Sequence, residues 1–127
     1  MLGKFILWLS AVSFTSYGLV SFFDPSVPAG YAGLTMANGD AFAEVGSMYG
    51  GLQTGFGLFC LLAALRPAYY RAGLVLLVMC IGTLALGRLY SGLTASDAVG
   101  AYTWGALAYE LFTACLAGIA LRSSLAS

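Results

Sequence analysis

Long runs of hydrophobic residues dominate the chain, and short polar or proline-containing segments separate them. Four runs can be read, at about 2–23, 45–65, 72–92 and 101–121. Each is close to the ~20 residues that an α-helix needs to cross a bilayer, and none has a proline in its interior. The pattern predicts an all-α integral membrane protein, with four helices packed as a four-helix bundle in one transmembrane domain over residues 1–127.

The segments between the runs predict how the helices are connected. The connections around Pro67 and at about 92–100 are short, so we expect the second, third and fourth helices to be antiparallel neighbours. The first connection, 24–44, mixes apolar and polar residues, and part of it is expected to lie along the membrane surface. The first run is longer than the core of a signal peptide and ends in Phe22 and Phe23, which favours a retained helix.

Composition excludes several functional classes. Hydrophobic residues make up 61% of the chain and charged residues 8%, and the net charge of zero argues against binding of nucleic acid. Histidine is absent, which excludes His-ligated haem, His-based zinc sites and the commonest general base. We therefore expect no metal and no cofactor. Cys60, Cys80 and Cys115 lack ligand spacing and are interpreted as small buried hydrophobes.

The charged residues orient the predicted helices. Four basic residues fall on one side of the membrane: Lys4, Arg66, Arg71 and Arg122. Four acidic residues fall on the other: Asp24, Asp40, Glu44 and Asp97. Because cytoplasmic ends collect lysine and arginine, both termini are predicted to be cytoplasmic.

The two remaining charges, Arg88 and Glu110, lie inside the third and fourth runs. Counting from the outer ends of their helices places them at depths of roughly 7 and 13 Å, an offset that an arginine side chain can bridge. A charge at such depth is costly on its own, so we expect both residues to face inward and to form an ion pair.

Polar and small residues at helical spacing predict which side chains surround this pair. One face of the fourth helix carries Thr103, Ala106, Glu110, Thr113 and Ala117, and one face of the second carries Gly46, Tyr49, Gly50, Gln53 and Gly57. Gln53 is thus a candidate third member of the cluster, with Tyr49 beside it. Glu44 and Tyr90 lie near the outer ends of their helices and could close the cluster from above, although Glu44 projects from the side of its helix opposite Gln53.

Two interpretations of the pair remain open. In the first, it holds the third and fourth helices together and fixes their register. In the second, Arg88, Glu110, Gln53 and Tyr49 line an outward-facing cavity, where Arg88 binds an anionic head group or carboxylate and apolar walls take the tail. A proton relay through Glu110 is a further variant, but a paired carboxylate suits a static role better.

The glycines of the second helix form two overlapping small-xxx-small patterns, Gly46 with Gly50 and Gly51 with Gly55. Such patterns let helix backbones approach closely in lipid. They are explained either by packing inside the bundle or by self-association and ligand contact.

Short motifs in four parts of the chain resemble a known family. They are Tyr49-Gly50-Gly51-Leu52, Leu65-Arg66-Pro67, Gly87-Arg88-Leu89 and Glu110-Leu111. In this order they are similar to the small bacterial membrane proteins catalogued as domain of unknown function 4345. The resemblance covers nearly the whole chain and implies four helices and no established activity. We expect the protein to lie in a bacterial inner membrane.

Three functional hypotheses follow. The leading one is a non-enzymatic accessory or interaction subunit that binds a partner protein or lipid through its helix faces and outer loop. The alternative is a small carrier or receptor for an amphipathic, lipid-like ligand held at Arg88 and Glu110. An enzyme is third, because Glu110 with Tyr49 or Tyr90 is the only acid and base set that the chain offers.

Overall fold

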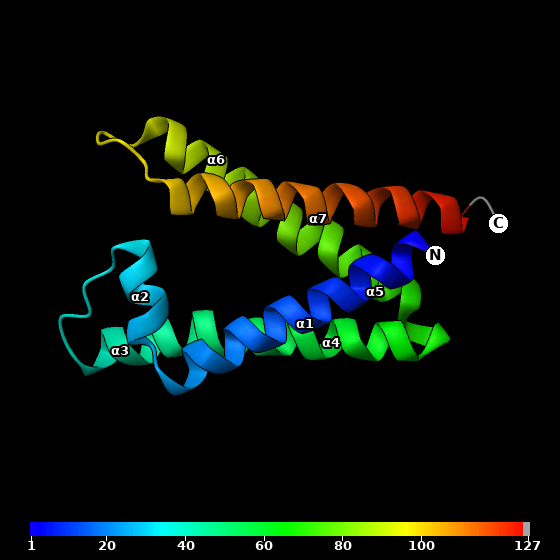
Figure 1. Ribbon diagram of the computed structural model, residues 1–127, viewed down its shortest axis with the longest axis horizontal. Coiled ribbons are helices and arrows are strands. Elements are labelled where there is room, and N and C mark those ends of the chain that lie inside the picture. The colour runs from blue at the N-terminus through cyan, green and yellow to red at the C-terminus, as the bar shows by residue number, and fades with distance from the viewer. Residues whose placement is uncertain (126–127) are drawn as a thin grey trace. The chain divides into compact units, whose positions relative to one another are not determined.

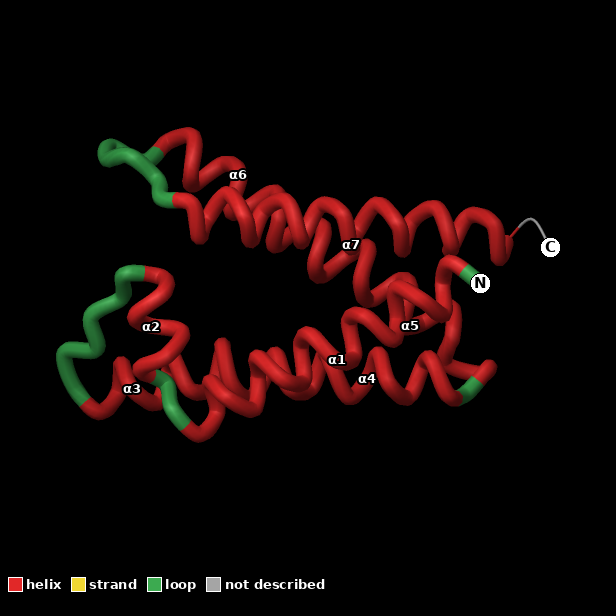
Figure 2. The backbone as a smooth tube through the Cα atoms, viewed as in Figure 1, coloured by secondary structure: helices red, strands yellow, loops and turns green. Residues whose placement is uncertain are grey.

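The computed structural model describes residues 1–125, which are helical apart from short connections and contain no strand (Figures 1 and 2). The α-helices are α1 (Leu2–Phe23), α2 (Ser26–Ala32), α3 (Gly39–Val45), α4 (Gln53–Leu65), α5 (Tyr70–Leu76), α6 (Gly82–Thr94) and α7 (Ala101–Leu125). Two π-helical segments, η1 (Gly46–Leu52) and η3 (Leu77–Ile81), and one 3-10 turn, η2 (Pro67–Tyr69), join them.

Four helical stretches in the described residues are long and apolar enough to cross a membrane: Leu2–Phe23, Gly39–Leu65, Pro67–Thr94 and Ala101–Leu125. The predicted all-α class with four membrane-spanning helices is thus confirmed. The first stretch has the predicted bounds, and the other three are longer than predicted because helical structure continues into the flanking polar residues. The Asn38 side chain, for example, accepts a hydrogen bond of 2.9 Å from the Ala41 N–H and so begins α3 well before residue 45.

The described chain divides into two compact units. Unit 1 contains Met1–Leu7 together with the described residues from Ala63 onward, and unit 2 contains Trp8–Leu62. The interpretation of the whole chain as a single domain stays a prediction.

In unit 2, α1 packs against the second span through glycine. A Cβ added to Gly57, Gly50 or Gly18 would lie under 3.0 Å from backbone atoms of the opposite helix, at Thr15, Phe22 and Thr54 respectively. Since residue numbers rise along one helix as they fall along the other, the two helices are antiparallel (Figure 1). Backbones at this distance leave no space for side chains, so glycine is required at the contact.

The segment between α1 and α3 was predicted to be a loop, but it contains a short helix. Ser26 donates from its backbone N–H and its hydroxyl to Asp24 Oδ1, at 3.1 and 2.5 Å, and α2 follows. Pro28 lies in the first turn of α2, where a missing N–H costs no helical hydrogen bond. Gly33, with φ of 68°, ends α2 in a left-handed conformation, and the Leu34 N–H donates to the Ala29 carbonyl oxygen at 2.8 Å.

In unit 1, the third span runs antiparallel to α7 (Figure 1). A Cβ on Gly118 would contact Val78, one on Gly82 would contact Ala114, and one on Gly92 would contact Trp104, all at ordinary distances of 3.5–3.8 Å. These helices therefore approach less closely than α1 and α4, and side chains fill the space between them. Arg71, just inside α5, donates a hydrogen bond to the Ser124 carbonyl oxygen at the end of α7.

Both π-helical segments interrupt otherwise α-helical spans. A π-helical turn inserts an extra residue into the α-helical ladder and shifts the face on which the following side chains lie. A helix face predicted from uniform α-helical spacing is therefore wrong for the residues that follow Gly46–Leu52. Gln53, the first residue of α4, is one of them.

Candidate functional site

The central feature of unit 1 is an ion pair between α6 and α7. Arg88 Nε donates to Glu110 Oε1 at 3.0 Å and to Oε2 at 2.9 Å, and Arg88 Nη2 donates to Oε1 at 2.7 Å. The side chain of Glu110 is 7% exposed and that of Arg88 is 24% exposed. The predicted pairing of the two charges is thus observed, with the carboxylate as the more buried partner.

The packing of α6 on α7 explains why these residues meet. Arg88 lies between Gly82 and Gly92 along the third span, and Glu110 lies between their counterparts, Ala114 and Trp104, on α7. Thr113 and Ala117, one and two turns further along α7, are fully buried, as the predicted inward face requires. The same face carries Glu110 toward α6, so the register of the helices sets the pair.

The chemistry of the pair is that of charge-assisted hydrogen bonding. Both carboxylate oxygens of Glu110 accept from the guanidinium, an arrangement that adds geometric specificity to the electrostatic attraction. In a membrane, leaving either charge without its partner is costly, and this cost couples α6 to α7. Such an arrangement suits a structural role, although the side chain of Arg88 is partly exposed.

Tyr90, the third predicted site residue of unit 1, does not join the pair. It follows Arg88 by two residues on α6, and such residues do not share a helix face. Its side chain is 72% exposed and makes no hydrogen bond to Arg88 or Glu110. A role for Tyr90 in ligand binding stays a prediction.

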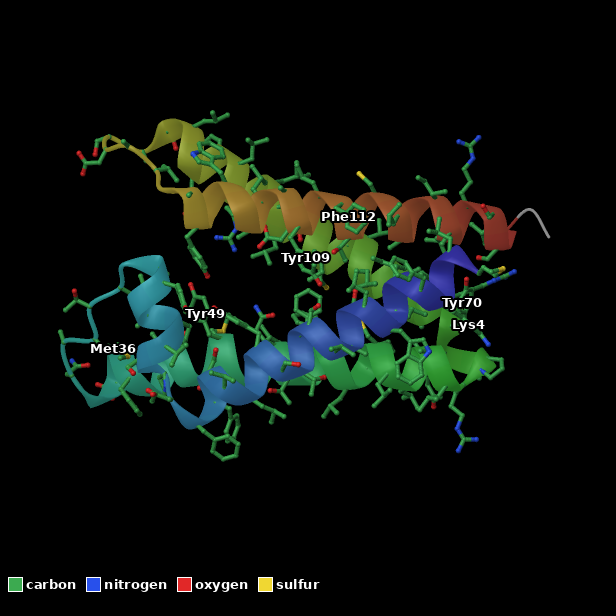
Figure 3. The ribbon with its side chains drawn as sticks, viewed as in Figure 1. Lys4, Met36, Tyr49, Tyr70, Tyr109 and Phe112 are labelled. Carbon is green, nitrogen blue, oxygen red and sulfur yellow. The ribbon has the colours of Figure 1, made fainter. Side chains whose placement is uncertain are left out.

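The other predicted site residues belong to unit 2, where they follow one another along one span. Glu44 is exposed at the end of α3, while Tyr49 in η1 and Gln53 at the start of α4 are half-buried. Figure 3 labels Tyr49 on this span. A common site of these three residues with Arg88 and Glu110 stays a prediction.

Comparison with known proteins identifies a family and no individual relative. A family model described as "Domain of unknown function (DUF4345)" matches residues 2–121. The chain belongs to this family. No curated protein and no solved structure matches the chain.

The glycine patterns of this family member separate into two kinds once the neighbours are known. A Cβ on Gly50 would lie 2.5 Å from the Cα of Phe22, and one on Gly46 would lie 3.2 Å from Pro25. Gly51 and Gly55 have nothing within 4 Å of the corresponding position. The first pattern serves packing inside unit 2, and the self-association predicted through Gly46, Gly50, Gly51 and Gly55 stays a prediction.

Two features of the chain were not predicted from the sequence. Cys60 is buried as predicted, but Cys80 and Cys115 are exposed, so the prediction of three buried cysteines is wrong for these two. Cysteine is apolar enough to lie on a helix face turned toward lipid.

The second feature is a cavity of unit 1 beside Lys4 and Tyr70, whose lining residues are too far apart in sequence for spacing to reveal it. Within residues 1–125, no group of three His, Cys, Asp or Glu residues could hold a metal ion.

Proposed function

We propose that this protein is a non-enzymatic accessory or interaction subunit of a membrane, which binds a partner protein or lipid through its helix faces and the segment 24–44. The observation that supports the proposal is the mutual engagement of Arg88 and Glu110 by three hydrogen bonds. Charges used in this way stabilise a helix pair and are not free to act as acid and base on a substrate.

The segment 24–44 supplies a surface for such binding. Tyr31, Leu34 and Phe42 are exposed, although α2 and α3 give the segment a defined helical structure. Exposed aromatic and aliphatic side chains on an ordered segment are typical of contacts with lipid or with another protein.

The test is to extract the protein from native membranes into lipid nanodiscs and to determine the mass and composition of the particle. The proposal expects a second protein or a defined set of lipids to accompany the chain in fixed ratio. Replacing Leu34 and Phe42 by serine is expected to release that component. Leu93→Ser, which changes an exposed residue near the end of α6, is the matched control and is expected to retain it. A lone monomer with no second protein and no lipid in fixed ratio would contradict the proposal.

The alternative of a carrier or receptor for an amphipathic ligand rests on the exposure of Arg88, which exceeds that of Glu110. In this alternative, a carboxylate or head group binds the partly exposed Arg88 side chain through charge-assisted hydrogen bonds. A fluorescent fatty acid is then expected to bind the detergent-solubilised protein and to be lost from Arg88→Gln. Equal binding by Arg88→Gln and the unchanged protein would argue against a carrier.

We further propose a bacterial inner membrane location with both termini cytoplasmic. The support is the collection of Lys4, Arg66, Arg71 and Arg122 at one end of the spans. A reporter fused after the last residue, active only in the cytoplasm, is expected to be active. Activity of a reporter that works only outside the cytoplasm would reverse the orientation.

A further inference from the structure

A cavity lies in unit 1 where α1 and α5 begin and α4 ends. Its volume is about 270 Å³, and it is open on one side. Its lining residues are Met1, Lys4, Ala63, Ala64, Leu65, Pro67 and Tyr70. The cavity therefore combines the lysine ammonium and the tyrosine phenol with a largely apolar surface.

Close packing holds the walls of this cavity in place. The Tyr70 hydroxyl lies against Gly3, where any Cβ would overlap it, and Figure 3 shows Tyr70 and Lys4 at the same end of unit 1. One turn deeper, a Cβ on Gly73 would lie under 3.0 Å from both Leu7 and Ala63. The first two turns of α1 are thus fitted to α5, and the cavity is a product of that fit.

The cavity lies at the basic end of unit 1. Arg66 stands between two of its wall residues, and Arg71 follows Tyr70 and donates to the Ser124 carbonyl oxygen near Arg122. The acidic residues of unit 1 are elsewhere: Glu110 pairs with Arg88, and Asp97 lies in the connection beyond the far end of α6. Lys4 consequently forms no ion pair within the part of unit 1 that the structure describes.

We propose that this cavity binds the phosphate of an anionic phospholipid head group, with the Lys4 ammonium and the Tyr70 hydroxyl donating to phosphate oxygens. Lysine binds phosphate as a compact point charge, and basic sites between helices at the membrane surface attract anionic lipid. The apolar walls, which line the ends of two spans, contact the glycerol and the first acyl methylenes.

Depth and size both favour this ligand. The cavity is bounded by the first turn of one candidate span, the last residues of the second and the first residues of the third, which is where head groups lie in a bilayer. Pockets for drug-sized molecules are typically about 300–1,000 Å³, so this cavity is suited to a head group and not to a whole lipid. The proposal goes beyond the accessory role, because it holds whether or not the protein has a protein partner.

Native mass spectrometry of the full chain in detergent, titrated with phosphatidylglycerol or with phosphatidylcholine, tests the proposal. We expect tighter binding of phosphatidylglycerol, and a loss of its affinity of about tenfold in Lys4→Gln, since a charge-assisted contact contributes on that order. The matched control is Arg122→Gln, which removes the same charge at the same end of unit 1 without touching the cavity and is expected to change affinity less than about twofold.

Other results would overturn the proposal. Equal affinity for the two lipids does so, and so does an equal loss in Lys4→Gln and Arg122→Gln, which would indicate diffuse attraction to the basic end. Inorganic phosphate is also titrated alone: phosphate binding that is lost in Lys4→Gln, with no preference of the unchanged protein for phosphatidylglycerol, would assign the site to a free anion and overturn the lipid proposal. If circular dichroism shows that Lys4→Gln is not folded, Tyr70→Phe, which removes only the hydroxyl, takes its place and is expected to weaken binding in the same direction.

Discussion

Two helix pairs, one in each unit, are held together by different means. In unit 2, α1 meets the second span at glycines whose missing side chains bring backbones into contact. In unit 1, α6 and α7 are separated by ordinary side-chain distances and joined by the ion pair of Arg88 with Glu110. In a membrane, neither contact gains from a hydrophobic driving force between helices. The first depends on shape and the second on charge, and substitutions can separate the two contributions.

The largest expected effect comes from removing one charge of the pair. Glu110→Leu leaves the Arg88 guanidinium without its partner and is expected to lower the free energy of unfolding by about 3 kcal/mol, as measured by denaturant titration in detergent. The double variant Arg88→Leu with Glu110→Leu is the control, because an apolar pair requires no charge compensation, and it is expected to recover most of the loss. A double variant as unstable as the single one would show that the pair does not act as a unit.

The second effect tests the glycine contact of unit 2. In Gly50→Ala the new Cβ would lie 2.5 Å from the Cα and 2.6 Å from the backbone nitrogen of Phe22, so α1 must move. We expect a loss of about 1–3 kcal/mol, the usual cost of overpacking. Gly55→Ala is the control, because a Cβ added to Gly55 would have nothing within 4 Å, and it is expected to be tolerated. Equal stability of both variants in thermal unfolding would refute the close backbone contact.

A smaller effect is expected from buried hydroxyls, which both units contain. Thr113 in unit 1 and Ser21 in unit 2 are fully buried, and their hydroxyl oxygens have no hydrogen-bond partner within residues 1–125. Thr113→Val and Ser21→Ala remove those hydroxyls with little change of shape. We expect each to leave stability unchanged or to raise it by up to about 1 kcal/mol in the same unfolding assay. A loss of that size in either variant would instead reveal a hydrogen bond that the hydroxyl makes in the membrane.

The smallest effect sharpens the comparison at a single residue type. Gly82 of unit 1 faces Ala114, and a Cβ there would lie 3.7 Å away, an ordinary van der Waals distance. Gly82→Ala is therefore expected to change stability by less than about 0.5 kcal/mol. If its thermal unfolding matched that of Gly50→Ala, glycine would be as necessary between α6 and α7 as between α1 and the second span, and the contrast between these two helix pairs would be wrong.

The ion pair of unit 1 was predictable because an unpaired charge inside a hydrophobic helix has a high energetic cost. A deep charge in a hydrophobic run needs a partner, and the short connection before α7 makes the neighbouring helix the place to find one. Arg88 and Glu110 therefore followed from depth alone. Tyr90 was included on depth too, but two residues along a helix change the face, which leaves its side chain exposed.

Which glycines form a helix contact could not be predicted from the sequence pattern. Gly50 and Gly55 belong to similar small-xxx-small patterns, yet only Gly50 meets the backbone of α1. The π-helical segment η1 lies across these patterns and shifts the faces beyond it, so uniform α-helical spacing does not give the neighbours of Gly55. Helix α2 escaped for a related reason: proline and glycine suggested a loop, while their positions in the first turn and after the last residue are those that a short helix accepts.

Sequence alone determined that the chain has four helices long and apolar enough to cross a membrane, that four of its five basic residues gather at one end of them, and that Arg88 and Glu110 must meet. These properties depend on hydrophobic length and on the cost of an unpaired charge, both of which act on individual residues and their immediate neighbours. Only the tertiary structure decided which glycines carry a helix contact and where Lys4 and Tyr70 enclose a cavity. Those properties depend on how two helix surfaces fit, and a fit between residues as distant as Lys4 and Tyr70 exists only once the chain has folded.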